Sequence, residues 1–250
     1  MVLMKIRVAS VAPAVIDGDV AVNYGHLLRL AEIACVRGVD MVVLPEAVAC
    51  GYVAADLTPY AESLDSPPLV AFRQLSERHG VMMVVGYVGE AGNGKVDNNV
   101  AVWDCGQLLG VHTKGSLWPD DARPHRDERR LLNRGTDEGI FMTRFGRIAV
   151  LICYENMVPE NWERLRGKGI DMVVSCYNCE DDPGRHNVYG SSLLGVPSVW
   201  SNRVGLTFQG DGCYGMNPGT SGFTDASGTV TAITAQGVED ILYHNVHLTM

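Results

Sequence analysis

The order of apolar and amphipathic segments along the chain occurs twice. Residues 37–43, RGVDMVV, closely match residues 168–174, KGIDMVV, and each apolar run follows a helix-like segment. A glycine before each run fits the C-terminus of a helix that leads into a buried strand. Each half predicts strand, helix, strand, helix, strand and then a hairpin, at residues 98–110 and 219–233, with a glycine near each turn.

This pattern predicts the fold class. Strands that are apolar throughout and separated by helices indicate βαβ crossovers, and the hairpins add antiparallel strands, so each half forms a mixed sheet. Two such sheets, each covered by helices on one face, would bury their other faces against each other. We therefore expect an α/β protein, a four-layer α-β-β-α sandwich built from two similar halves. No Pro/Gly/Ser-rich linker separates them, which predicts one domain over residues 1–250 with halves of roughly 1–140 and 141–250.

Two segments lie outside the repeated pattern. Residues 114–140 are polar and irregular, and loops of this length in compact domains are usually functional or disordered. Residues 208–222, FQGDGCYGMNPGTSG, are rich in glycine and predict a flexible loop.

Composition narrows the class of protein. The formal net charge of −9 argues against nucleic acid or an anionic membrane surface as partners. No stretch approaches the roughly 18 apolar residues of a membrane span, and the start of the chain lacks the pattern of a signal peptide. The 7 cysteines are an odd number and sparse, unlike a secreted disulfide framework. These features predict a cytoplasmic protein with free thiols.

Three reactive side chains follow three predicted strands. Glu46 follows MVVLP, Lys114 follows the first hairpin, and Cys153 follows the apolar run 148–152. Ligands of open α/β sheets bind at the carboxyl ends of strands, so these residues can share one site. A cysteine thiol needs a base or a nearby cation to act as a nucleophile. Glu46 is a candidate base, and Lys114 can stabilise a thiolate and the oxyanion of a tetrahedral intermediate.

Four segments together resemble the signatures of the nitrilase superfamily of carbon–nitrogen hydrolases, in order and in spacing. The segments are VVLPEAVACGY (42–52), HTKGSLW (112–118), DERRLLNRG (127–135) and LICYENMVPE (151–160). The resemblance covers most of the chain and implies a Glu–Lys–Cys catalytic triad on a duplicated α-β-β-α sandwich. It also implies a homodimer or larger homo-oligomer and no metal or organic cofactor.

The resemblance assigns roles to individual residues. It implies that Glu46 is the general base, Lys114 the oxyanion stabiliser and Cys153 the nucleophile. It also implies that Glu128 is a second glutamate, which orients the lysine and the substrate. We further assign Tyr52, Tyr154 and Asn178 to substrate binding. The segment 176–190, which begins CYNCEDDPGRH, departs from the family pattern, so the sequence does not identify the substrate.

Other interpretations of these residues stay open. Cys153 is a buried structural cysteine if it is considered alone, because cysteine is among the most buried residue types. A Cys–His dyad with His125 or His186 is the main mechanistic alternative. Cys176 and Cys179 have C-x-x-C spacing, but without a second pair they are better interpreted as pocket-lining residues or as coincidence than as a redox or zinc motif.

The sequence as a whole predicts a thiol hydrolase of the amidase type. We expect it to cleave a non-peptide C–N bond of a small amide or carbamoyl compound through a cysteine thioester, releasing ammonia or an amine. The alternatives are nitrile hydrolysis, acyl transfer to an amine, and a non-catalytic binding protein with the same fold. Cys-Tyr-Glu-Asn at 153–156 differs from the Cys-Trp-Glu-His pattern of typical nitrilases, which favours an amide over a nitrile.

Overall fold

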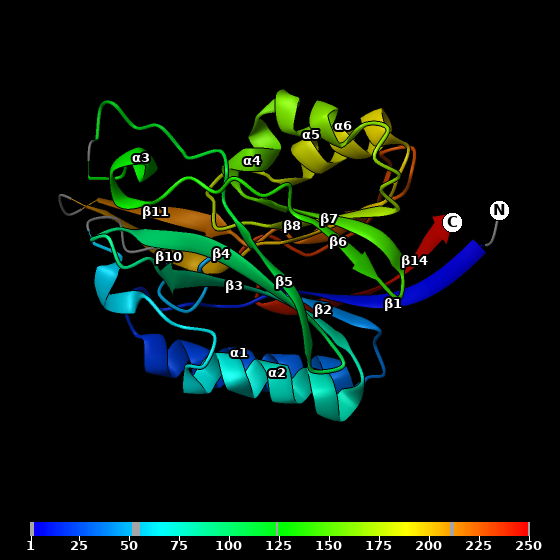
Figure 1. Ribbon diagram of the computed structural model, residues 1–250, viewed down its shortest axis with the longest axis horizontal. Coiled ribbons are helices and arrows are strands. Elements are labelled where there is room, and N and C mark those ends of the chain that lie inside the picture. The colour runs from blue at the N-terminus through cyan, green and yellow to red at the C-terminus, as the bar shows by residue number, and fades with distance from the viewer. Residues whose placement is uncertain (1–2, 52–55, 124, 211–212, 250) are drawn as a thin grey trace.

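The computed structural model describes residues 3–51, 56–123, 125–210 and 213–249. It has four layers, with α1 and α2 below a first sheet and α5 and α6 above a second (Figure 1). The predicted α-β-β-α sandwich with two mixed sheets is therefore confirmed. Tyr52, which we assigned to substrate binding, lies outside the described residues.

The first sheet has six strands in the order β14-β1-β2-β3-β4-β5. The central strands β1, β2 and β3 are parallel, whereas β4, β5 and β14 pair antiparallel to their neighbours. In chain order the bounds are β1 Leu3–Ala12, β2 Met41–Val43, β3 Met82–Glu90, β4 Val96–Asp104, β5 Gln107–Thr113 and β14 Asp240–Thr249.

The second sheet repeats this arrangement in the order β6-β7-β8-β9-β12-β13. Strands β7, β8 and β9 are parallel, and the other three are antiparallel to their neighbours. Each sheet has an antiparallel edge strand next to its first parallel strand: β14 next to β1 in the first sheet, and β6 next to β7 in the second. In the chain β6 directly precedes β7, whereas β14 lies at the far end of the described residues from β1. The bounds are β6 Ile140–Thr143, β7 Gly146–Ile152, β8 Met172–Cys176, β9 Ser198–Ser201, β12 Gly222–Thr224 and β13 Val230–Ile233.

The helices are the expected crossovers between parallel strands. Helix α1 (Val20–Val36) is capped by the Asp19 side chain, and α2 (Pro67–His79) begins with two prolines and ends at Gly80 in the left-handed conformation. The second half has α4 (Tyr154–Met157), α5 (Pro159–Leu165) and α6 (Gly184–Leu194). The segment 114–140 is largely irregular but contains α3 (Glu128–Leu131) and the first residue of β6.

The glycine-rich segment differs from our prediction. We expected a flexible loop over residues 208–222, but β10 (Val204–Gly210) and β11 (Cys213–Pro218) form a two-stranded antiparallel ribbon across most of it. Leu206 pairs with Met216 in the register of this ribbon, and Phe208 pairs with Tyr214, whose ring centroid is 5.5 Å away. Such cross-strand apolar pairs stabilise a ribbon in spite of its glycines.

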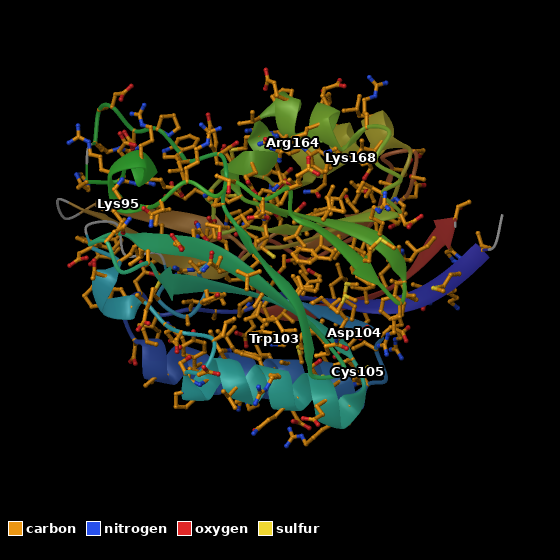
Figure 2. The ribbon with its side chains drawn as sticks, in the orientation of Figure 1. Lys95, Trp103, Asp104, Cys105, Arg164 and Lys168 are labelled. Atoms are coloured by element: carbon orange, nitrogen blue, oxygen red, sulfur yellow. The ribbon has the colours of Figure 1, made fainter. Side chains whose placement is uncertain are left out.

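Apolar clusters between the layers hold them together. The largest lies between the two sheets, with side chains such as Val84 from the first and Val150 from the second. Trp103 on β4, labelled in Figure 2, is buried in the cluster between the first sheet and its helices. Trp162 has the same role between the second sheet and α5 and α6. The strand ends that carry the predicted site are therefore fixed by well-packed elements on both sides.

Candidate active site

Lys114 lies between two carboxylates. Its Nζ donates to Glu46 Oε1 at 2.8 Å and to Glu128 Oε1 at 2.7 Å. All three residues are buried, with exposed fractions of 3% or less. The structure thus brings together three of the four residues that we predicted to be catalytic, from three separate segments of the chain.

Glu46 is held after β2 by contacts from both halves. Its carboxylate accepts a second hydrogen bond from Asn98 Nδ2 on β4 at 2.7 Å, and its backbone N–H donates to the Tyr177 carbonyl at 3.2 Å. The neighbouring strand approaches closely at Gly86, where an added Cβ would lie 2.2 Å from the Pro45 oxygen and 2.7 Å from the Glu46 Cα. Only glycine allows this approach, so Gly86 helps to fix the backbone of Glu46.

Glu128 is the first residue of α3 and is held at both oxygens. One oxygen accepts from Lys114, and the other accepts from the Trp118 backbone N–H at 2.7 Å. Asp127 caps the short helix by accepting from the Arg129 N–H. Lys95, labelled in Figure 2, donates to the Arg129 carbonyl at 3.0 Å and so ties α3 to the segment before β4.

Cys153 directly follows β7 in an unusual backbone conformation. Its φ of 45° is positive, which is uncommon for a residue with a Cβ. Its N–H donates to the Cys176 carbonyl at 2.8 Å, and α4 begins at the next residue. Strained backbone of this kind costs of the order of 1–3 kcal/mol and clusters at functional sites. The turn places Cys153, which is 8% exposed as a whole residue, in the lining of the cavity.

One cavity of about 260 Å³ joins these residues. Its lining includes Glu46, Lys114, Glu128 and Cys153, together with Tyr154 and Asn178, which we predicted to bind substrate. Tyr154 meets Trp118 edge-on, with ring centroids 5.0 Å apart. Neither His125 nor His186 is among the described residues of the lining. Within those residues the structure therefore provides no histidine for a Cys–His dyad.

The electrostatics of the cavity favour a neutral thiol at rest. Burial raises the pKa of Glu46 above its ordinary value, although Lys114 opposes this shift. Burial disfavours the charge of Lys114, but Glu128 and Glu46 outweigh it and hold the pKa of Lys114 high. A hydrogen bond with Cys179, burial and the negative charge of Glu46 raise the pKa of Cys153. Lys114 lowers it, so the cation is the group that favours the thiolate.

The C-x-x-C segment contributes one residue to this cavity. Cys176 is buried in the core between the sheets, whereas the half-buried Cys179 lines the cavity and hydrogen-bonds Cys153. Pocket lining, one of the two interpretations that we favoured for this pair, therefore applies to Cys179. Among the described residues, no group of three or more His, Cys, Asp or Glu side chains is arranged to hold a metal ion.

Two neighbours of the site were not predicted from the sequence. Asn98 donates to Glu46, and Trp118 donates its backbone N–H to Glu128 and lines the cavity. Asn98 lies in a strand that also carries Asp97 and Asn99, so the pattern does not single it out, although a buried asparagine has to find a polar partner. The position of Trp118 depends on the path of an irregular loop, which the pattern of the sequence does not specify.

The fold and this site define a class of protein. The structure has two helix-covered mixed sheets, and a strained cysteine, a buried lysine and two buried glutamates line one cavity. This is the arrangement that the resemblance to the nitrilase superfamily implies. The sequence profile described as carbon–nitrogen hydrolase matches residues 7–250, nearly the whole chain. The chain therefore belongs to the carbon–nitrogen hydrolase family, and the resemblance inferred from its four segments is confirmed.

Individual relatives are more distant. The chain is 28% identical over 207 residues to a glutamine-dependent NAD(+) synthetase from Acinetobacter baylyi, a match that covers 80% of this chain and 37% of the synthetase. It is 28% identical over 172 residues to an (R)-stereoselective amidase from a Pseudomonas species, covering 68% of this chain and 59% of the amidase. The chain thus spans less than two thirds of the length of either relative.

Solved structures share the fold over almost the whole chain. A carbon–nitrogen hydrolase from Helicobacter pylori G27 superposes with a TM-score of 0.86 at 21% identity, covering 97% of this chain and 89% of the other. At this identity the likeness supports the fold alone. In the described residues, no helix combines the length and the apolar character that crossing a membrane requires.

Proposed function

We propose that this protein hydrolyses the C–N bond of a small, non-peptide amide or carbamoyl compound, with Cys153 as the nucleophile. The observation that carries the proposal is the buried Glu46–Lys114–Glu128 cluster, which lines the same cavity as the strained Cys153. A purely structural site would not need two acids and a lysine buried beside a thiol, because burying charges is costly.

The first half of the reaction forms a thioester. Glu46 takes the proton of the Cys153 thiol while the sulfur attacks the carbonyl carbon, which suits a base whose pKa is raised by burial. The oxyanion of the tetrahedral intermediate is stabilised by the Lys114 ammonium and by the backbone N–H after Cys153. The C–N bond then breaks, and ammonia or an amine leaves with the proton held by Glu46.

The second half releases the acid. A water molecule gives a proton to Glu46 as its oxygen attacks the thioester carbon, and the intermediate collapses to a carboxylic acid while the proton returns to the sulfur. Glu128 keeps Lys114 in place, because it holds Nζ with one oxygen and the Trp118 backbone with the other. Tyr154 and Asn178 line the cavity and are proposed to contact the substrate, and we keep Tyr52 as a candidate.

An amide is preferred to a nitrile for two reasons. The residue after Cys153 is tyrosine, followed by Glu155-Asn156, unlike the typical nitrilase pattern. The relative from Pseudomonas is an (R)-stereoselective amidase. Nitrile hydrolysis, acyl transfer to an amine and a non-catalytic binding function are the alternatives, and one experiment separates them.

The experiment is intact mass spectrometry of the protein after brief incubation with a panel of small amides and nitriles. We expect an acyl adduct on Cys153 from an amide, with loss of ammonia or an amine, and the adduct should be absent in Cys153→Ala and present in Cys179→Ala. Interception of the adduct by an added amine would indicate acyl transfer. An adduct from nitriles alone, turnover by Cys153→Ala, or no adduct from any compound would overturn the amidase proposal.

We also propose that the protein is a homodimer in a reducing, cytoplasmic compartment. The resemblance to the superfamily supports a dimer that packs two sandwiches together. The thiols support the compartment, because the six cysteines whose side chains are described are all free. Sedimentation equilibrium of the purified protein tests the dimer, and a mass of one chain at micromolar concentration would refute it.

A further inference from the structure

A second charge cluster, centred on a buried histidine, lies next to the site but outside the cavity. His112 on β5 is fully buried, and both of its ring nitrogens face carboxylates: Nδ1 pairs with Asp137, and Nε2 pairs with Glu155 at 2.9 Å. A ring that donates to two carboxylates is an imidazolium. Burial opposes its charge, but Asp137 and Glu155 outweigh burial and raise the pKa of His112 to about 9. We refer to His112, Asp137 and Glu155 as the His112 network.

The two acids of this network also hold the backbone on both sides of Lys114. Asp137 Oδ2 accepts the N–H of Thr113 at 3.0 Å, and Glu155 Oε1 accepts the N–H of Gly115 at 2.7 Å. Because the residues before and after Lys114 are both anchored, the Cα of Lys114 has little freedom to move. His112 fixes the distance between the two anchors by binding both.

The same network reaches the nucleophile. Glu155 Oε2 accepts the N–H of Ile152 at 2.7 Å, and Ile152 is the residue directly before Cys153. One buried carboxylate therefore joins Gly115, which follows the first sheet, to the end of β7 in the second sheet. Asn161 reinforces this joint, since its Nδ2 donates to Ser116 Oγ and to the Glu155 carbonyl.

We propose that His112, Asp137 and Glu155 are positioning residues that set the place of Lys114 relative to Cys153. None of the three is among the described residues that line the cavity, so they act through the backbone of Lys114 and Cys153 and not on the substrate. This inference rests on the proposed function, because the position of Lys114 relative to Cys153 matters for that reaction. The position itself can be probed without turnover. Displacements of about 1 Å at a reacting group cost about 10²-fold in rate.

The test uses the pH dependence of Cys153 alkylation by iodoacetamide, located by peptide mass spectrometry, in the full-length protein. Lys114 is the group that lowers the pKa of the thiol, so a displaced Lys114 leaves less thiolate at a given pH. We expect His112→Gln to alkylate more slowly than wild type by a factor of about ten at pH 8, with the profile moved to higher pH. A merely loosened fold would expose the thiol and speed alkylation.

Two further variants keep the test decisive. The Asp137 side chain is 41% exposed, so Asp137→Asn should fold even if His112→Gln does not. We expect Asp137→Asn to slow the alkylation of Cys153 as well, by a smaller factor than His112→Gln. The matched control is His79→Gln, which removes another His–Glu pair, at 2.8 Å from Glu32, away from the cavity. It should leave the profile unchanged.

Turnover then separates the two proposals. With an amide that acylates the wild type, the network variants should lower kcat by about 10- to 100-fold with little change in KM, because the substrate contacts are intact. If the wild type acylates from no amide, the proposed function fails and the alkylation profiles still decide the positioning role. Alkylation that is unchanged or faster in both network variants would overturn that role.

Discussion

Replacing Lys114 by methionine would leave two buried acids facing each other without their shared cation. In the wild type Nζ lies 2.8 Å from the Glu46 oxygen and 2.7 Å from the Glu128 oxygen, so these two oxygens are at most about 5.5 Å apart. At that distance two unit negative charges repel by about 3 kcal/mol at an effective dielectric constant of about 20. Methionine has a similar length, so the change removes charge and leaves only a small cavity. Breaking a buried ion pair from one side typically costs about 3–5 kcal/mol.

The loss of stability should depend on pH. Lys114 lowers the pKa of Glu46, so its removal raises a pKa that burial has already raised. An acid whose pKa is higher in the folded than in the unfolded state adds stability below its unfolded pKa, and this stability is lost as the pH rises through the folded pKa. We therefore expect Lys114→Met to lose about 3–5 kcal/mol relative to wild type at pH 8, and clearly less at pH 5, where Glu46 takes up a proton.

The measurement is urea unfolding followed by far-ultraviolet circular dichroism at both pH values. Lys114→Met/Glu128→Gln should recover part of the loss at pH 8, because it removes one of the two opposed charges. The matched control is Lys168→Met, at the half-exposed Lys168–Glu138 pair (Figure 2), which should cost less than about 1 kcal/mol. Equal losses at pH 5 and pH 8, or a Lys114→Met variant as stable as the control, would refute this account of the site.

Two other substitutions test the supports of the site. Gly86→Ala should destabilise the protein by about 1–3 kcal/mol and lower kcat, because its Cβ would collide with backbone atoms of Pro45 and Glu46. The control is Gly25→Ala, where an added Cβ meets nothing within 4 Å. Equal unfolding free energies for the two variants would contradict the packing argument. His112 has a pKa of about 9 when folded and an ordinary value of 6.5, so its stabilisation is complete below about pH 6.5 and is lost as the pH rises through 9. The difference in unfolding free energy between wild type and His112→Gln should therefore shrink by about 3 kcal/mol between pH 6.5 and pH 10, and a constant difference would show that His112 is not a buried cation.

The sequence predicted the two sheets but not the ribbon between β9 and β12. The repeated strands are apolar over several residues, and their signal is local. The strands β10 and β11 are rich in glycine and form a two-stranded sheet with each other, so much of their stability comes from partners such as Phe208 and Tyr214. Such cross-strand pairs depend on a register that local hydrophobicity does not reveal.

The site was predictable to the extent that its residues follow strands. Glu46, Lys114 and Cys153 each follow a strand, and the carboxyl ends of parallel strands gather at one edge of a sheet. Glu128 required the family resemblance, because α3 is only four residues long and lies in an irregular segment. His112 was missed, since its partners lie 25 and 43 residues further along the chain and nothing in the spacing relates them.

The two charge clusters explain why β5 keeps its place at the edge of the first sheet. Most of its residues are exposed or half-buried, so apolar packing holds it weakly. Side chains two residues apart in an extended segment point to the same face, and Lys114 N–H continues the pairing with β4 by donating to the Asn98 carbonyl at 2.9 Å. His112 and Lys114 therefore project together, and each is held between two acids. Because an uncompensated buried charge is costly, the four acids fix the position of the segment through its two cations. A lysine that directly follows an exposed edge strand can in this way be located as firmly as a residue in the core.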